Sequence, residues 1–192
     1  MRKALVANGC LTTRLARALS VPDPLAKLIS EPAPGVFTFE AFTPRYCKRL
    51  LSELSKFEDV APNSMNRYGR VLQDIGYAHL CEDLLFNLVN PLVRRLYPSI
   101  GGLNDYHGFT VSYSKKQRSL DRHVDSSIIT LNICLGGDFK GGKLVFSDDD
   151  GDVLAKLDHK VGTAVLHPGD YLHEAKNIRS GQRTNLILWC RK

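Results

Sequence analysis

The spacing of hydrophobic residues changes near residue 108 of this 192-residue chain. Before that position, apolar residues recur every three or four residues, and after it they alternate with polar residues. Intervals of three and four are typical of helices with one buried face, whereas alternation is typical of strands. Helices followed by strands predict an α+β fold, in which N-terminal helices buttress a β core.

Two helices and a short third one are predicted in the first half. Thr43 and Pro44 suit the N-cap and the first turn of a helix, and the apolar spacing after them predicts a helix over 44–57. A second helix is predicted over about 79–88. Because proline disrupts a helix interior, Pro91 should end this helix and begin the short third one.

Short alternating segments, separated by Gly, Asp and Pro, make up the second half of the chain. This texture is typical of an antiparallel sandwich or barrel. One strand is expected before the first helix as well. The predicted strands are 36–39, 109–114, 129–135, 144–146, 163–167 and 184–190.

The first 34 residues differ from the rest in charge and in pattern. Four basic residues precede the first acidic residue, Asp23, and the segment ends in a turn-rich stretch. We therefore expect residues 1–34 to form a basic, loosely ordered N-terminal extension and residues 35–192 to form one folded domain. A basic head without acidic residues also resembles an organelle import signal, which is the alternative to a cytoplasmic location.

Composition narrows the class of protein. The chain has 43% hydrophobic and 24% charged residues, which are ordinary values for a globular domain. Its five cysteines include no Cys-x-x-Cys pair, which disfavours a disulfide framework or a zinc ribbon and favours reduced thiols in the cytoplasm. No apolar run is long enough to predict a membrane span.

The formal net charge of +6 raises the question of a nucleic-acid partner. The basic residues do not form one stripe, because part of the excess lies in the head and part lies at Lys115, Lys116 and Arg118. A solvated surface explains this distribution, so a nucleic-acid partner is not expected.

Six histidines are present, and none of them alone indicates a metal site. His123 and Asp125, however, are two residues apart, and residues at that spacing on a strand share one face. A second histidine from a distant strand would complete a set of two imidazoles and one carboxylate. Such a set holds non-haem Fe(II) and leaves coordination positions open.

Further motifs follow the His-x-Asp pair in a fixed order. They are Thr130-Leu-Asn-Ile-Cys-Leu, Phe139-Lys-Gly-Gly-Lys-Leu-Val-Phe146, Gly162, His173, Gly181-x-Arg183 and Trp189. In this order they resemble the Fe(II)/2-oxoglutarate-dependent dioxygenases, in the branch of the prolyl and lysyl hydroxylases. The resemblance covers roughly residues 36–192 and implies a double-stranded β-helix, or jelly-roll, core with Fe(II) at one mouth.

The resemblance makes His173 the third metal ligand, beside His123 and Asp125. His167 is the competing candidate, because it also follows the strand that begins near residue 163. His173 precedes Arg183 by ten residues, as the ligand does in the family, and His167 does not. We therefore expect His167 to line the pocket or to lie behind the ligands.

The resemblance also implies 2-oxoglutarate as co-substrate and O2 as oxidant, with ascorbate as a further candidate cofactor. The distal carboxylate of 2-oxoglutarate would form a bidentate ion pair with Arg183. Tyr113 and Thr130 are two candidates for a hydroxyl that assists this anchor, and packing in the core is the alternative for each. Asn132 and Asn185 are candidate pocket residues, because a buried amide without a partner is costly.

The family places its substrate across the barrel mouth, under loops from the N-terminal region. Residues 63–69 resemble such a loop, so Asn66, Arg67 and Tyr68 are candidate substrate contacts, and an ordinary surface loop is the alternative. The expected reaction is hydroxylation of a protein or peptide side chain, Pro or Lys, with release of succinate and CO2.

The sequence leaves one alternative function open and disfavours three others. Hydroxylation of a free amino acid or other small metabolite would use the same motifs. Nucleic-acid demethylation is disfavoured, because Arg183 and Arg191 are eight residues apart rather than closely spaced on one strand. A non-catalytic jelly-roll binding module, or a metal-binding sandwich without 2-oxoglutarate, is disfavoured because all three ligands and Arg183 are present. The sequence does not indicate an oligomeric state.

Overall fold

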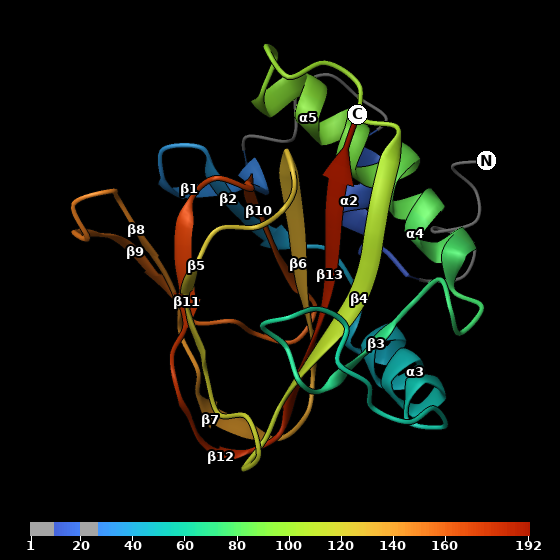
Figure 1. Cartoon of the computed structure of the whole chain (residues 1–192). Helices are drawn as coiled ribbons and strands as arrows, with labels where there is room; N and C mark the ends of the chain where they lie inside the picture. The colour runs from blue at the N-terminus through green and yellow to red at the C-terminus, as the bar shows by residue number, and fades with distance from the viewer. Residues whose placement is uncertain (1–9, 20–26) are drawn as a thin grey trace.

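Two antiparallel sheets face each other and form the core of the chain (Figure 1). The computed structural model describes residues 10–19 and 27–192. The larger sheet has the strand order β1-β2-β10-β6-β13-β4-β3, with bounds Ser30–Ala33 (β1), Val36–Glu40 (β2), Thr163–Pro168 (β10), Ile129–Gly136 (β6), Arg183–Arg191 (β13), Asp105–Tyr113 (β4) and Gly69–Val71 (β3).

The smaller sheet has the order β5-β11-β8-β9, and a two-stranded ribbon joins β12 to β7. From β4 onward, the chain passes back and forth between the larger and the smaller sheet, which is the path of a double-stranded β-helix. The predicted jelly-roll core is therefore confirmed. The bounds are Leu120–His123 (β5), Leu172–Ala175 (β11), Leu144–Ser147 (β8), Val153–Leu157 (β9), Ile178–Gly181 (β12) and Phe139–Gly141 (β7).

Both faces of the larger sheet are buried. On β13, Leu186 and Leu188 belong to the hydrophobic cluster shared with the helices, whereas Ile187 and Trp189 belong to a cluster between the two sheets. Alternate residues of one strand thus face two different cores. The face between the sheets also carries the buried polar residues Arg183 and Asn185, and the helices cover the other face (Figure 1).

The helices predicted after residue 43 occur in the predicted order with shifted ends, and one helix that was not predicted precedes them. They are α2 (Thr13–Ala18), α3 (Pro44–Leu54), α4 (Ala78–Leu84), the π-helical turn η2 (Leu85–Val89) and α5 (Asn90–Leu96). The Thr43 hydroxyl accepts a hydrogen bond from the Tyr46 backbone N–H at 3.2 Å, which confirms the predicted N-cap. α3 ends at Leu54, before the predicted end at residue 57.

The prediction that Pro91 separates two helices is wrong. α4, η2 and α5 follow one another without a break from Ala78 to Leu96. The wider π turn lies directly before Pro91, where the helix lacks one N–H donor and must make room for the proline ring. Leu84, Leu88 and Leu92 stay buried along this continuous helix, so packing against the sheet holds it together.

The described part of the N-terminal extension packs on the domain, contrary to its loose sequence pattern. Leu15 and Ala18 of α2 are buried in the core shared with the larger sheet, and Leu11 forms a β-bridge with Phe42. The basic residues Arg2 and Lys3 lie outside the described residues. The division at residue 35 stays a prediction. None of the described helices has the length and apolar character that a membrane span requires.

Candidate metal centre

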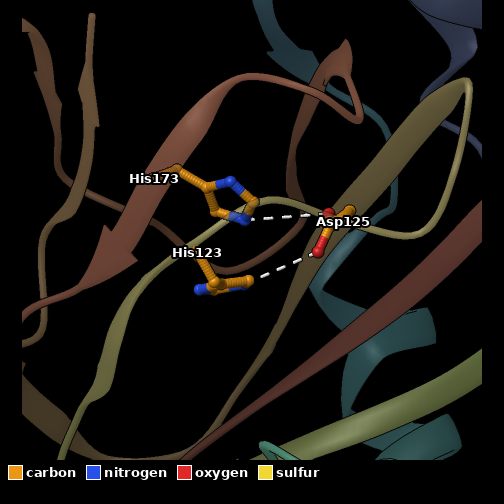
Figure 2. A group of neighbouring side chains, drawn as sticks. All are labelled: His123, Asp125 and His173. Atoms are coloured by element: carbon orange, nitrogen blue, oxygen red, sulfur yellow. Dashed lines mark ion pairs between the residues drawn. The ribbon is translucent and has the colours of Figure 1, made fainter. Parts of the chain in front are cut away.

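Three side chains from separate positions converge between the sheets (Figure 2). His123 is the last residue of β5, and His173 lies directly opposite it in β11. Asp125 follows β5 in a loop. One ligand atom from each of the three lies within 4.8 Å of the others, and the Nε2 atoms of His123 and His173 are 3.5 Å and 3.7 Å from the Asp125 carboxylate oxygens.

The sequence suggested that strand alternation positions Asp125 beside His123. Instead, β5 ends at His123, and Asp125 lies in the loop that follows. Its backbone N–H donates to the Gly169 carbonyl at 2.8 Å, and the Thr130 hydroxyl donates to its Oδ2 atom at 2.6 Å. The Ser127 hydroxyl in turn lies 2.8 Å from the Thr130 hydroxyl. A Cβ atom at Gly169 would lie 2.1 Å from the Ser127 carbonyl oxygen, so this contact requires glycine.

Backbone carbonyls fix the orientation of both imidazoles. His123 Nδ1 is 2.7 Å from the Asp121 carbonyl, and His173 Nδ1 is 2.9 Å from the Tyr171 carbonyl. A carbonyl can only accept, so each Nδ1 carries the proton and each Nε2 presents a lone pair to the site. Two such lone pairs beside a carboxylate fit a divalent cation, and this donor set suits Fe(II).

Burial and mutual contact tune the three groups. Burial would raise the pKa of Asp125, but contact with His123 and the nearby His173 and His167 hold this pKa well below its usual range. Burial would lower the pKa of His123, and contact with Asp125 outweighs it and raises the pKa. Burial, with His167 next, lowers the pKa of His173 to about 3. The site therefore holds an ionised carboxylate beside a neutral His173 at neutral pH.

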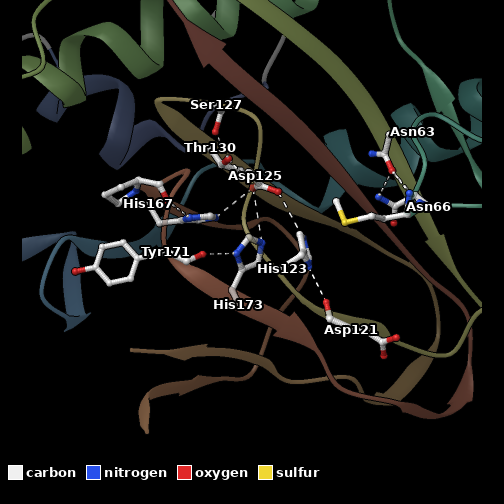
Figure 3. Close-up of polar contacts among 12 residues, drawn as sticks. Asn63, Asn66, Asp121, His123, Asp125, Ser127, Thr130, His167, Tyr171 and His173 are labelled. Carbon is white, nitrogen blue, oxygen red and sulfur yellow. Dashed lines mark hydrogen bonds and ion pairs between the residues drawn. The ribbon is translucent and has the colours of Figure 1, made fainter. Parts of the chain in front are cut away.

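His167 lies beside this group of three without belonging to it (Figure 3). Its Nε2 atom is 4.0 Å from Asp125 Oδ2 and has no hydrogen-bond partner, while its Nδ1 donates to the Pro168 carbonyl at 2.8 Å. The ring is fully buried against His173 and Phe146, with centroid distances of 4.8 Å and 5.0 Å. The structure thus places His167 behind the candidate ligands.

A pocket opens onto the three candidate ligands. Most of its wall is apolar, and Trp189 packs edge-to-face on Phe109 within it, at a centroid distance of 4.9 Å. An apolar wall excludes water and strengthens the few polar contacts inside it. The lining residues are Asn66, Phe109, Val111, Tyr113, Leu120, His123, Asp125, Asn132, Leu144, His173, Ala175, Ile187 and Trp189.

Arg183 is a buried cation beside this pocket. It lies opposite Tyr113 in the pairing of β13 with β4, and its guanidinium carbon is 4.3 Å from the centre of the Tyr113 ring. The side chain is 1% exposed and donates to the Gly142 carbonyl. Within the described residues no carboxylate pairs with it, and its Nε has no hydrogen-bond partner. A buried guanidinium without an acidic partner favours the binding of an anionic ligand.

A polar chain leads from Asn132 into the core beside Arg183. The Asn185 side-chain amide donates to Asn132 Oδ1 at 3.0 Å and lies 3.2 Å from His159 Nδ1. His159 Nε2 is 3.1 Å from the Thr163 carbonyl, which places its proton there and leaves Nδ1 as the acceptor. Burial, followed by the charge of Arg183, lowers the pKa of His159 to about 3, so this ring is neutral.

The structure brings most of the sequence-predicted residues together. Tyr113 and Asn132 line the pocket, and the Tyr113 ring lies over the Arg183 guanidinium. That the Tyr113 hydroxyl assists the co-substrate anchor stays a prediction. Thr130 differs, because its hydroxyl contacts the Asp125 carboxylate rather than Arg183. Sequence analysis did not single out His159, because its contact with Asn185, 26 positions away, arises only in the folded chain.

Comparison with known proteins identifies relatives among the 2-oxoglutarate and iron-dependent oxygenases. Residues 7–102 match the family model described as an OGFOD2-like domain. The chain is 35% identical over 211 residues to 2-oxoglutarate and iron-dependent oxygenase domain-containing protein CP2 of Arabidopsis thaliana, over 97% of this chain and 54% of that protein. It is 28% identical over 178 residues to procollagen-lysine,2-oxoglutarate 5-dioxygenase 1 of Homo sapiens, over 84% of this chain and 24% of that protein.

A solved structure supports the fold. A Pseudomonas putida prolyl-4-hydroxylase superposes with a TM-score of 0.63 at 18% identity, over 91% of this chain and 98% of that one. At this identity the likeness concerns the architecture alone. The chain spans about half the length of the curated relatives it matches first.

Proposed function

Because the chain belongs to the 2-oxoglutarate- and iron-dependent oxygenases, with an OGFOD2-like domain, we propose that it hydroxylates a C–H bond of a protein or peptide side chain, Pro or Lys. The reaction would consume 2-oxoglutarate and O2 and release succinate and CO2. Support for a protein substrate comes from the similarity to a procollagen-lysine dioxygenase.

In this proposal His123, Asp125 and His173 hold Fe(II). Their converging Nε2 lone pairs and ionised carboxylate are the observation that fits the metal. Bound iron would supply the oxidising power when 2-oxoglutarate and O2 are present. Thr130 keeps the Asp125 carboxylate turned toward the two imidazoles through its 2.6 Å hydrogen bond.

Arg183 binds the distal carboxylate of 2-oxoglutarate, and this assignment carries the proposal. A guanidinium that is 1% exposed and lacks an acidic partner among the described residues is costly unless an anion joins it. The Tyr113 ring packs over the guanidinium, and Tyr113 and Asn132 both line the pocket beside it. The apolar wall around them keeps water from the reacting C–H bond.

Succinate formation tests the proposal. Purified protein is loaded with Fe(II) without oxygen and then given 2-oxoglutarate and air, with and without a set of Pro- and Lys-containing peptides. We expect succinate that disappears in the His173→Ala variant, and a higher rate with one peptide class. The His79→Ala variant is the matched control, because that side chain is 94% exposed and makes its ion pair with Glu82 alone. Equal succinate from wild type and His173→Ala would contradict the proposal.

A further inference from the structure

Asn66 presents an unpaired hydrogen-bond acceptor at the metal pocket. The residue is 2% exposed and lines the pocket together with His123 and Asp125. Figure 3 shows it on the opposite side of His123 from His167. Its Nδ2 group donates to Asn63 Oδ1 at 3.1 Å, whereas its Oδ1 atom is buried without a partner.

The loop fixes which end of the Asn66 amide is free. Asn63 Oδ1 accepts from the backbone N–H groups of Met65 and Asn66 at 3.0 Å and 2.8 Å, in addition to the Asn66 side chain. Because Asn63 Oδ1 can only accept, the atom that faces it must be the nitrogen of Asn66. The carbonyl end of the Asn66 side chain is therefore left for another molecule.

We propose that Asn66 Oδ1 binds an N–H group of the substrate, and that this group is a neutral peptide amide. This inference rests on the proposed function for the metal pocket. A buried acceptor without a partner is costly, and a substrate donor would remove this cost. Oxygenase substrates that lack such a donor would leave the acceptor unsatisfied and be discriminated against.

The charge of the pocket selects an amide over an ammonium group. Asp125 is the one acidic residue among the described residues that line the pocket, and it already belongs to the metal set. An ammonium would enter an apolar wall beside a metal ion without a counter-charge of its own. A neutral N–H group avoids this penalty.

A second unpaired atom has the complementary polarity. Trp189 lines the same pocket, and its Nε1–H group is buried without a partner. Asn66 thus offers an acceptor and Trp189 offers a donor. A peptide unit carries one N–H and one C=O group, so it offers a partner of each kind, whereas an isolated ammonium group offers donors alone.

Two small capped proline amides test the contribution of the substrate N–H group to binding. Acetyl-proline N-methylamide has a single N–H group, and acetyl-proline N,N-dimethylamide has none. Trp189 is the only tryptophan of the chain, so its fluorescence reports binding to the pocket without turnover. The Mn(II)-loaded protein is titrated with both probes and with n-butylamine as the ammonium arm. We expect the N-methylamide to bind about tenfold more tightly than the dimethylamide, and than the amine.

Three variants separate an acceptor from a structural role. In Asn66→Ala the two amides should bind equally. In Asn66→Asp, which keeps an acceptor and adds a charge, the preference should move toward the amine. In Gln117→Ala, which removes the hydrogen bond to the Arg67 backbone N–H of the same loop but keeps both Asn63 and Asn66, both amides should weaken equally and the tenfold ratio should persist.

The outcomes distinguish this inference from the proposed function. Equal affinity of wild type for both amides, or no measurable affinity for either, would overturn the role of Asn66 even where succinate forms. Loss of the ratio in Gln117→Ala as well as in Asn66→Ala would also overturn it, because disturbance of the loop alone would then explain the effect. A tenfold ratio without any succinate formation would support Asn66 and contradict the proposed reaction.

Discussion

His167 and Asp125 approach each other through two atoms that both accept hydrogen bonds, at 4.0 Å between Nε2 and Oδ2. Two acceptors gain nothing from such proximity unless a proton or a cation lies near both. His173 makes a shorter approach of 3.7 Å to the same oxygen and is grouped with His123 by geometry. We therefore expect His173 to be a metal ligand and His167 to lie behind the ligands. Measured metal affinities of variants distinguish these two roles.

His173→Ala should weaken Mn(II) binding at least about 100-fold, because it removes a ligand atom, whereas His167→Leu should weaken it by about tenfold or less. Calorimetric titration of the two variants and wild type with Mn(II) measures this difference. The fully buried position of His167 makes the apolar leucine a fitting replacement. The reverse order of affinities would assign the third ligand to His167.

Arg183→Met should separate co-substrate binding from folding. Removal of the buried guanidinium should lower the affinity for 2-oxoglutarate about 100-fold, because a charge-assisted ion pair is lost. The melting temperature without 2-oxoglutarate should stay the same or rise, because an uncompensated buried charge is gone. Thermal unfolding with and without 2-oxoglutarate, at saturating Mn(II), checks both effects. A 2-oxoglutarate-induced stabilisation equal to that of wild type would exclude Arg183 as the anchor.

His159 should make stability depend on pH. Its pKa is about 3 in the folded chain, against a usual value of 6.5, so the unfolded chain binds the proton first as the pH falls. The contribution is therefore complete above about pH 6.5 and is lost progressively toward pH 3.

The His159→Gln variant removes this titration. Between pH 7 and pH 4, metal-free wild type should lose roughly 3 kcal/mol more unfolding free energy than the variant. Urea unfolding at a series of pH values measures the difference. Parallel pH dependence in the two proteins would mean that His159 is not held neutral.

Regular strands explain what the sequence could predict. His173 lies on β11 and Arg183 on β13, and these strands belong to facing sheets joined by a short ribbon. The ten-residue spacing between them in the sequence therefore corresponds to a defined arrangement in the fold. Alternation along β4 and β13 likewise brings Tyr113 and Arg183 into register. Where backbone geometry is regular, spacing in sequence translates directly into position.

Irregular contacts between separate segments of the chain explain the features that the sequence could not predict. Asp125 is oriented by the Gly169 carbonyl and the Thr130 hydroxyl, which come from other segments of the chain. Pro91 sits in a continuous helix because packing and a π turn outweigh its local preference. The free acceptor of Asn66 depends on which amide atom faces Asn63, a detail that residue type alone does not carry.

Thr130 offers the sharpest test of such a contact, because two roles for its hydroxyl lead to different measurements. If it holds Asp125, as the 2.6 Å hydrogen bond indicates, Thr130→Val should weaken Mn(II) binding about tenfold and leave 2-oxoglutarate affinity at saturating metal unchanged. Valine keeps the shape of threonine, so the effect isolates the hydroxyl. Thr130→Ser keeps the donor and should bind metal nearly as wild type does. A variant that loses 2-oxoglutarate affinity while keeping its metal would instead make Thr130 part of the co-substrate anchor, as the sequence first suggested.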